Sequence, residues 1–161
     1  MRIVSLVGNR PQFVKAAPLC TALRAFGDEV LVHSGQHYDP ELADLFFVEL
    51  GIPTPDHALD VGPGTPIHQI AIMMERFEHV VRDERPDAVL VYGDTTTTLA
   101  GALVAAKCGV PLAHVEAGLR SFDKSMPEEQ NRVVTDHLSD VLLCPTQQAV
   151  DNLAREGVTK G

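Results

Sequence analysis

The sequence predicts an α/β fold: a doubly wound, Rossmann-like parallel sheet with helices on both of its faces. The first observation is a series of short, uniformly apolar runs, which is typical of strands buried on both faces of a parallel sheet. The second is that amphipathic stretches alternate with these runs, as βαβ units require. The third is that Pro stands near the start and Gly near the end of most amphipathic stretches.

The apolar runs and the amphipathic stretches give the elements in chain order. The predicted strands span residues 2–7, 29–34, 88–93, 111–117 and 140–145. The predicted helices span residues 11–26, 40–50, 66–84, 96–108, 127–138 and 146–156. The Pro- and Gly-rich segment 51–66 is the one long loop, with room for a short strand at His57–Asp60, and it fits a binding loop or a plain surface connection equally well.

Composition and charge narrow the class of protein. The 161 residues suffice for one domain with a real core, and 13 Lys and Arg against 22 Asp and Glu give a net charge of −9. The basic residues are scattered, so we expect no nucleic-acid partner. The start, "MRIVSLVGNRP", is too short an apolar run for a signal peptide or a membrane span, so we expect a cytoplasmic protein.

The cysteines point away from a metal site. Cys20, Cys108 and Cys144 lie in apolar or helical settings, without a CxxC pair or a His at metal-binding spacing. We therefore expect reduced core cysteines and no zinc.

Ligands of such sheets bind beyond the carboxyl ends of the strands, and the first polar segment there is "GNRPQFVK". It lacks both the GxGxxG and the GxxxxGK[ST] pattern, which argues against NAD and ATP as ligands. Arg10 and Lys15 could hold a phosphate beside a helix N-terminus, or could simply be solvated cations.

Two further loops carry polar side chains at the same edge. In "SGQHYDPE", Asp39 before Pro40 is a natural helix N-cap, whereas Gln36 and His37 have no such structural explanation. In "YGDTTTT", Asp94 follows a strand; Asp94 or Thr95 could cap the next helix, and Asp94 is equally well placed to act as an acid or a base.

The fourth long strand runs into "HVEAGLR", where Glu116 leaves a buried strand just before a turn. A carboxylate at such a place needs partners, and Glu116 is the strongest catalytic candidate on chemistry alone. His114 points to the same sheet face if the strand continues, and it is as consistent with packing as with function.

The segment "SMPEEQNR" carries a structural and a functional interpretation together. Ser125-x-x-Glu128 has the pattern of a capping box, and Glu128 and Arg132 are spaced as an i,i+4 ion pair. Capping alone does not explain why Glu129 and Arg132 crowd the same turn. Carboxylates and arginines converging on one crevice suit acid–base chemistry on an anionic substrate, with Glu129, about 100° around the helix, expected to matter less than Glu128.

These motifs, in this order and spacing, resemble the N-terminal half of the non-hydrolysing UDP-N-acetylglucosamine 2-epimerases. The resemblance covers essentially the whole chain, and "HVEAGLRSFDKSMPEEQNRVVTDHLSD" is its most specific part. It implies a two-domain GT-B arrangement with the active site in the cleft, of which residues 1–161 are the N-terminal Rossmann-like domain. It also implies interconversion of UDP-GlcNAc and UDP-ManNAc without NAD or a required metal.

The resemblance assigns roles to particular residues. It implies that Asp94, Glu116 and Glu128 are the catalytic carboxylates, that Arg10 and Lys15 contact the substrate or its diphosphate, and that Arg132 lies beside the substrate; Gln36 and His37 are further substrate-binding candidates. The implied mechanism is anti elimination of UDP to a 2-acetamidoglucal, followed by re-addition at C2. Which carboxylate is acid and which is base stays open.

The resemblance also implies a homodimer, a role in cell-envelope polysaccharide biosynthesis, and a second domain that holds most uridine-diphosphate contacts. Tyr38-Asp39-Pro40 and the arginine-free "VGPGTPIHQ" depart from members that bind UDP-GlcNAc as an allosteric activator. Two alternatives remain at this point: a hydrolysing epimerase or GT-B glycosyltransferase, and a non-catalytic module that binds sugar nucleotides or dimerises.

Overall fold

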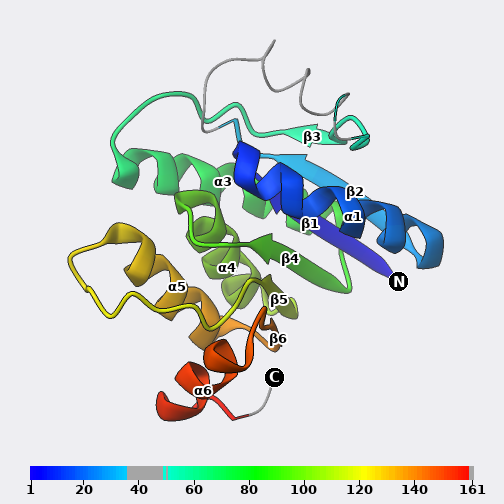
Figure 1. Cartoon of the computed structure of the whole chain (residues 1–161). Helices are drawn as coiled ribbons and strands as arrows, with labels where there is room; N and C mark the ends of the chain where they lie inside the picture. The colour runs from blue at the N-terminus through cyan, green and yellow to red at the C-terminus, as the bar shows by residue number, and fades with distance from the viewer. Residues whose placement is uncertain (36–48, 50, 160–161) are drawn as a thin grey trace.

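The computed structural model describes residues 1–35, 49 and 51–159, which form a parallel α/β domain (Figure 1). Over these residues the sheet has six parallel strands in the order β3-β2-β1-β4-β5-β6. The strands are β1 (Arg2–Val7), β2 (Asp28–His33), β3 (His57–Ala58), β4 (Ala88–Tyr92), β5 (Leu112–Val115) and β6 (Val141–Leu143). Every predicted strand is confirmed, including the short one in the long loop, with ends shifted by a few residues.

The helices also follow the prediction closely. They are α1 (Arg10–Phe26), α3 (Pro66–Glu84), α4 (Thr96–Cys108), α5 (Pro127–Leu138) and α6 (Gln147–Arg155). The helix predicted over 40–50 lies, apart from Glu49, outside the described residues. Proline occupies the first turn of α1, α3 and α5, where its missing N–H costs no helical hydrogen bond.

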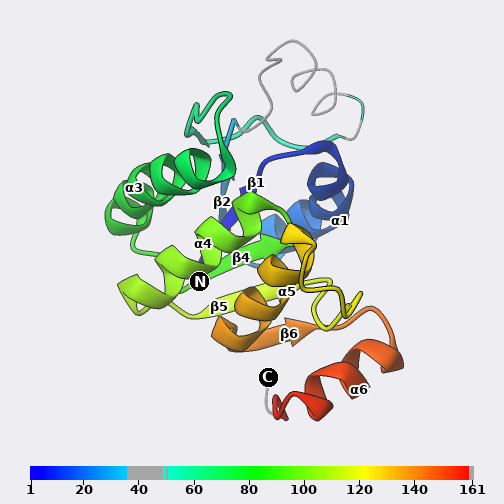
Figure 2. The ribbon, with the colours of Figure 1, turned by 90° about the vertical axis from the view of Figure 1, so that its left-hand side faces the viewer.

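Helices cover both faces of the sheet, which confirms the doubly wound prediction. In Figure 2, α1 lies on one side of the sheet, and α3 and α4 lie on the other. α5 packs beside α4, and α6 lies beyond β6, at the far end of the sheet from β3 (Figures 1 and 2).

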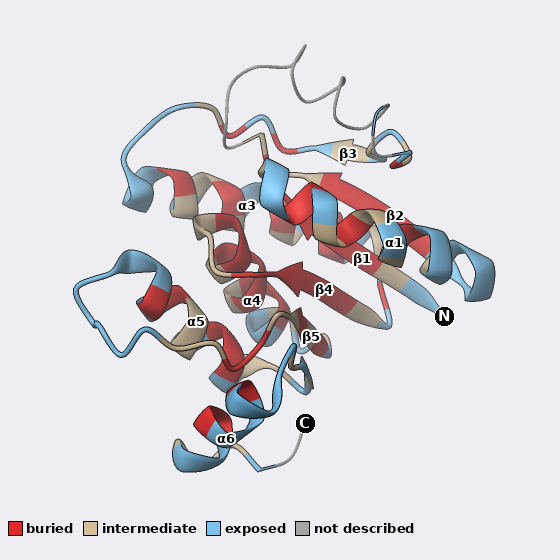
Figure 3. Cartoon of the chain, in the orientation of Figure 1, coloured by how far each residue is buried: buried red, intermediate tan, exposed pale blue. Residues whose placement is uncertain are grey.

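The core forms two layers because each central strand buries both of its faces (Figure 3). Toward α3 and α4, strand residues such as Val4 and Val91 pack against Met73 and Phe77. Toward α1, the buried cluster consists of Val7, Phe13, Ala16, Cys20, Leu31, Ile52, Leu90 and Tyr92. Both layers position the loops that leave the carboxyl ends of β1 and β4.

The three cysteines are free and differ in their burial. Cys20 is buried, and burial raises the pKa of its thiol to about 12. Cys108 and Cys144 are only half-buried, so the expectation of core cysteines holds fully for Cys20 alone.

Side chains cap most of the helices, and α5 is the exception. Asn9, Thr65, Thr95 and Thr146 each accept a hydrogen bond from the first turn of their own helices. The N-cap of α5 is Met126, which makes no such bond. Ser125 instead donates from its backbone N–H and its hydroxyl to Asp123. The predicted capping box of Ser125 and Glu128 is therefore wrong, because the Ser125 hydroxyl is bound to Asp123 in the preceding loop.

The loop 51–66 is anchored along the sheet and α3. Leu59 and Val61 are buried, and their N–H groups donate to the carbonyl oxygens of His33 and Ser34. The Arg76 guanidinium donates to two loop carbonyl oxygens, and the Gln69 amide donates to a third. Of the two interpretations left open, these contacts favour a surface connection.

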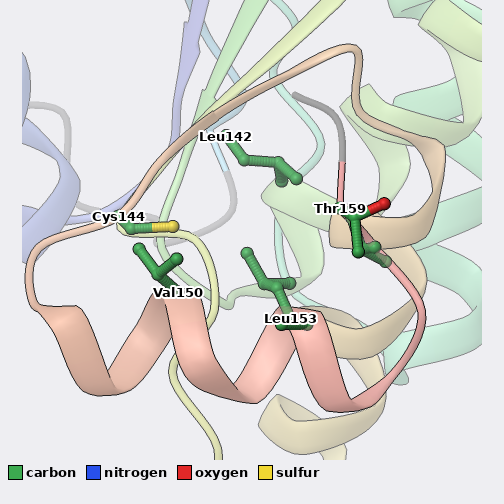
Figure 4. A pocket seen from close by; sticks show the side chains of 7 residues that line it. Leu142, Cys144, Val150, Leu153 and Thr159 are labelled. Carbon is green, nitrogen blue, oxygen red and sulfur yellow. The ribbon is translucent and has the colours of Figure 1, made fainter.

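An apolar groove lies between β6 and α6, as Figure 4 shows. Its volume is about 280 Å³, and it is lined by Leu142, Cys144, Val150, Leu153, Ala154, Val158 and Thr159. β6 is the last strand of the described sheet, and Val141 and Leu143 are each almost half exposed.

In the described part of the chain, no helix combines the length and apolarity that a membrane span needs.

Candidate active site

A polar cavity lies at the carboxyl ends of β1 and β4, between which the strand order of the sheet reverses. This reversal is where open α/β sheets place their ligands. The cavity has a volume of about 350 Å³ and is lined by Asn9, Pro11, Gln12, Lys15, Gly93, Asp94, Thr95, Thr96, Pro127, Glu128 and Asn131. The residues of its walls come from segments that are far apart in the chain, at the starts of α1, α4 and α5.

The N-termini of α1, α4 and α5 all line this cavity. Asn9 and Thr95 cap the first two helices with their side chains, so other backbone N–H groups of the first turns remain without a helical acceptor. The positive ends of the helix dipoles favour a bound anion. The cavity therefore combines an anion-binding rim with acidic side chains.

The structure separates the two roles that the sequence left open at the start of α4. Thr95 is the N-cap and forms a reciprocal capping box with Thr98. Asp94 does not cap; its carboxylate forms an ion pair with Arg132, and its carbonyl oxygen accepts a 2.8 Å hydrogen bond from the Asn131 amide. Asp94 is thus held at the cavity by α5.

Glu116 forms an ion pair with Lys15, one of the residues that line the cavity. Glu116 follows the end of β5 and has a φ of 75°, a left-handed conformation that is uncommon for a residue other than glycine. Gly93 lies beside this pair, since a Cβ on Gly93 would come within 3.3 Å of both charged groups. The sequence indicated that the Glu116 carboxylate needs a partner. That partner is Lys15, another candidate residue, and the two side chains meet beside Gly93.

Glu128 lines the cavity from the first turn of α5 and is exposed. It takes no part in a capping box, and the predicted Glu128–Arg132 ion pair is wrong. Arg132 instead pairs with Asp94 and, one helical turn back, with Glu129. Of the two structural explanations that the sequence offered for Glu128, neither holds, which leaves its carboxylate available to a ligand.

Arg10 is the exposed first residue of α1 and stands next to the cavity-lining Pro11. Gln36 and His37, like Asp39, lie outside the described residues. Within the parts of the chain that are described, no group of three or more His, Cys, Asp or Glu side chains is arranged to hold a metal ion.

Gln12 is a site residue that sequence reasoning missed. It is 1% exposed, its amide nitrogen donates to the Tyr92 carbonyl oxygen at 2.8 Å and approaches the Thr95 hydroxyl at 2.9 Å, and its amide oxygen accepts from the Gly8 N–H at 2.7 Å. These bonds tie the start of α1 to the start of α4. The only available signal was a polar side chain in a first helical turn, which does not reveal burial.

His114 belongs to the packing beneath the site. It is fully buried, with Nδ1 2.7 Å from an Asp136 carboxylate oxygen and Nε2 2.7 Å from the Gly93 carbonyl oxygen. The other carboxylate oxygen of Asp136 accepts from the Arg120 guanidinium and from the Gly118 N–H. Burial alone would raise the pKa of Asp136, yet the hydrogen bonds and charges of His114 and Arg120 outweigh burial and lower this pKa. This buried network joins β5 and the ends of the site loops to α5.

Comparisons with known proteins identify the family to which the chain is similar. The sequence profile described as UDP-N-acetylglucosamine 2-epimerase matches residues 22–161. A protein of Methanococcus maripaludis named as a UDP-N-acetylglucosamine 2-epimerase homolog is 51% identical over this whole chain, which spans 45% of its length. The UDP-2,3-diacetamido-2,3-dideoxy-D-glucuronate 2-epimerase of Pseudomonas aeruginosa is 50% identical over 98% of this chain and 45% of its own.

A solved structure extends the similarity to the fold. The UDP-GlcNAc 2-epimerase of Methanocaldococcus jannaschii, crystallised with UDP-GlcNAc and UDP, superposes with a TM-score of 0.94 at 47% identity, covering 98% of this chain and 44% of that one. The chain thus spans less than half the length of these relatives. Its fold and its matched sequence show that the chain belongs to the UDP-N-acetylglucosamine 2-epimerase family.

Proposed function

We propose that this chain is the N-terminal, Rossmann-like domain of a two-domain enzyme that epimerises UDP-N-acetylglucosamine at C2 to give UDP-N-acetylmannosamine. The observation that carries the proposal is the cavity at the β1–β4 reversal, where Asp94 and Glu128 line one wall and the Lys15–Glu116 pair borders another. The family membership supports the same activity, and the length of the relatives supports a second domain.

The rim of the cavity suits the anionic part of such a substrate. First-turn N–H groups of three helices and the side chains of Arg10 and Lys15 would meet a diphosphate, whose charge favours helix N-termini. The carboxylates would then lie against the sugar. A second domain would supply the opposite wall of the site, exclude water and complete the binding energy.

The reaction needs acid–base groups more than a cofactor. A base takes the C2 proton, the electron pair of that C–H bond forms the C1–C2 double bond, and the C1–O bond breaks so that UDP leaves with its electron pair. No carbonyl neighbours C2, so leaving-group departure must build positive charge at C1 to acidify the proton. Re-addition of UDP to the glucal, with a proton delivered to the opposite face of C2, completes the inversion, and atoms and charge balance.

Asp94, Glu116 and Glu128 are the residues that we assign to these proton transfers and to stabilisation of charge at C1. Arg132 fixes Asp94 through its ion pair, and Lys15 does the same for Glu116. Arg10, Gln36, His37 and Lys15 are assigned to substrate binding. Glu128 has the fewest competing contacts and is the residue to test first.

The test is the reaction of UDP-GlcNAc with the two-domain enzyme in heavy water, followed by proton NMR. The expected result is UDP-ManNAc with deuterium at C2 in both sugars at equilibrium, because the proton exchanges with solvent in the intermediate. Free ManNAc with UDP as final products would assign a hydrolysing epimerase instead. Transfer of GlcNAc to an acceptor without C2 exchange would assign a glycosyltransferase, and no reaction at all would contradict the proposal.

The Pseudomonas aeruginosa relative suggests a second candidate substrate, because its name specifies UDP-2,3-diacetamido-2,3-dideoxy-D-glucuronate. Both substrates carry UDP at C1 and an acetamido group at C2, so the same elimination and re-addition applies. Parallel assays with the two sugars decide between them: the true substrate is the one with the higher kcat/KM, which measures specificity.

We also infer that the 161-residue chain alone has no detectable epimerase activity and that the enzyme is a homodimer. The first inference is supported by the length of the relatives, of which this chain spans less than half, and the second by the resemblance to dimeric family members. Turnover of UDP-GlcNAc by residues 1–161 at ordinary enzyme rates would contradict the first. A monomer in sedimentation at high micromolar concentration would contradict the second. The cytoplasmic location and the role in cell-envelope polysaccharide synthesis stay predictions.

A further inference from the structure

Glu129 differs sharply from its neighbour Glu128. It is 3% exposed although it stands in the first turn of α5, at the rim of the site. One carboxylate oxygen accepts from the Ser121 N–H at 2.9 Å and from the Arg132 guanidinium at 3.0 Å, and the other accepts from the Phe122 N–H at 2.8 Å. Both oxygens are therefore already occupied, and Glu129 is absent from the cavity lining, to which Glu128 contributes instead.

The two backbone donors belong to the loop between β5 and α5, here the β5–α5 loop, residues 116–126. Phe122 in this loop has a φ of 61° and is 69% exposed. A left-handed aromatic residue is conformationally costly and is kept only where its surroundings hold it. The hydrogen bond from the Phe122 N–H to the buried Glu129 carboxylate stabilises this conformation.

The third donor leads to the catalytic candidates. Nη1 of Arg132 binds Glu129, and Nη2 of the same guanidinium binds Asp94. A planar guanidinium held at one nitrogen has a fixed direction for the other. Glu129 thus lies one side chain away from Asp94 and sets the orientation of the cation that Asp94 meets.

The electrostatics agree with this geometry. Burial alone would raise the pKa of Glu129, but the hydrogen bonds from the Ser121 and Phe122 amides and from Arg132 outweigh burial and lower this pKa below its ordinary value of 4.5. The side chain is therefore a carboxylate at neutral pH, with a donor bound to each of its oxygens.

We propose that Glu129 is the positioning residue of this site: it fixes the β5–α5 loop through two amides and, through Arg132, the carboxylate of Asp94. The inference deepens the proposed function, on which its kinetic part rests. Glu129 is still expected to affect turnover no more than Glu128 does, but a buried carboxylate with three donors is expected to affect it substantially. Glu128 meets the substrate in this assignment, and Glu129 acts only through other residues.

The experiment compares Glu129→Gln, Glu129→Asp and Glu128→Gln in the two-domain enzyme. In the Glu129→Gln variant, one carboxylate oxygen becomes an NH₂ group, which is itself a donor. It would face the Ser121 and Arg132 donors or the Phe122 N–H without accepting from them, so the loop should open. We expect hydrogen exchange in peptides from the β5–α5 loop to rise at least about tenfold, with exchange in β4 unchanged. We expect kcat for UDP-GlcNAc to fall about a hundredfold with KM within about threefold, because misplacement of a catalytic group mainly affects turnover.

The other variants serve as matched controls. Glu128→Gln should leave loop exchange as in the wild type, and Glu129→Asp, which keeps the charge, should have a kcat at least about tenfold above that of Glu129→Gln. Asp123→Asn removes another hydrogen-bonded carboxylate of the same loop and should alter kcat by less than about twofold.

The outcomes separate this proposal from the proposed function. Normal loop exchange in Glu129→Gln, exchange that rises equally in β4, or a kcat above about half of the wild-type value would each overturn the positioning role. A fall in kcat with a loop that exchanges normally would overturn it too, because it would mean a direct role. If the wild type does not epimerise UDP sugars, the proposed function fails, while the exchange measurements still decide whether Glu129 holds the loop.

Discussion

The first turns of α4 and α5 face the same cavity and are built in different ways. α4 begins in a run of threonines, and Thr95 and Thr98 satisfy each other's backbone donors within one helical turn. α5 begins after Met126 without a side-chain cap. Its polar residues reach outward instead: Glu129 to the preceding loop, and Asn131 and Arg132 to Asp94 at the start of α4.

This difference in capping suggests a different role for the start of each helix. The N-terminus of α4 is capped by its own residues, and Gln12 of α1 adds a contact from outside the helix. The N-terminus of α5 depends on contacts across 37 or 38 residues of chain and carries the exposed Glu128 into the cavity. Changes in the first turn of α4 are therefore expected to affect stability first, and changes in the first turn of α5 are expected to affect the chemistry first.

The largest expected effect tests this division at Glu128. Because Glu128 is exposed and caps nothing, Glu128→Gln in the two-domain enzyme should change the free energy of unfolding by less than about 0.5 kcal/mol. Loss of a general acid or base should lower kcat by about a hundred- to ten-thousand-fold. Steady-state conversion of UDP-GlcNAc and urea unfolding measure the two quantities. Retention of most of the rate would leave the chemistry to Asp94 and Glu116.

The next effect concerns the far end of α5, where Asp136 is buried among His114 and Arg120. Asp136→Asn leaves two cationic or donor groups without their carboxylate and should cost about 3–5 kcal/mol at neutral pH, measured by urea unfolding. The pKa of Asp136 is lowered in the fold, so its contribution is present above the ordinary value of 3.8 and is lost as the pH falls below it. The gap between wild type and variant should therefore narrow on acidification below pH 3.8. A constant gap would contradict the ion-pair explanation.

Substitution of Gln12 tests whether the start of α4 depends on its contact with α1. Gln12→Ala removes the amide that joins α1 to Tyr92 and Thr95 and leaves the buried Gly8 N–H without this acceptor. We expect a loss of about 2–4 kcal/mol in the free energy of unfolding, because unsatisfied buried polar groups add to the cost of the lost packing. A loss below about 1 kcal/mol would mean that water replaces the amide and that α4 stands independently of α1.

The sequence predicts the elements well and the contacts between them poorly. Uniformly apolar runs and the Pro11, Pro66 and Pro127 signals are local, and they predicted the described strands and helices to within a few residues. The edge of the sheet that carries the site follows from the same order of elements. The bonds of Gln12 to Tyr92 and of Arg132 to Asp94 span 80 and 38 residues, and no local pattern encodes them.

The same limit explains the wrong capping box. Ser125 and Glu128 have the right spacing, but a local pattern does not state which competing partner wins. Asp123 binds the Ser125 hydroxyl at 2.7 Å, and α5 begins with Pro127. The true capping box lies at Thr95 and Thr98, where the sequence offered Asp94 as an equally good cap. Arg132 removes that ambiguity by taking the Asp94 carboxylate.

The smallest effects make the sharpest comparison, because they compare the two helix starts through one substitution to alanine at each. Thr95→Ala should cost about 1 kcal/mol of unfolding free energy, as loss of an N-cap usually does. Ser125→Ala should cost under about 0.3 kcal/mol, because Ser125 caps no helix and its bonds to Asp123 are exposed. Urea unfolding of both variants beside the wild type measures the difference. Equal losses at the two positions would restore Ser125 as the cap of α5 and would remove the distinction between a helix that closes on itself and one that reaches into the site.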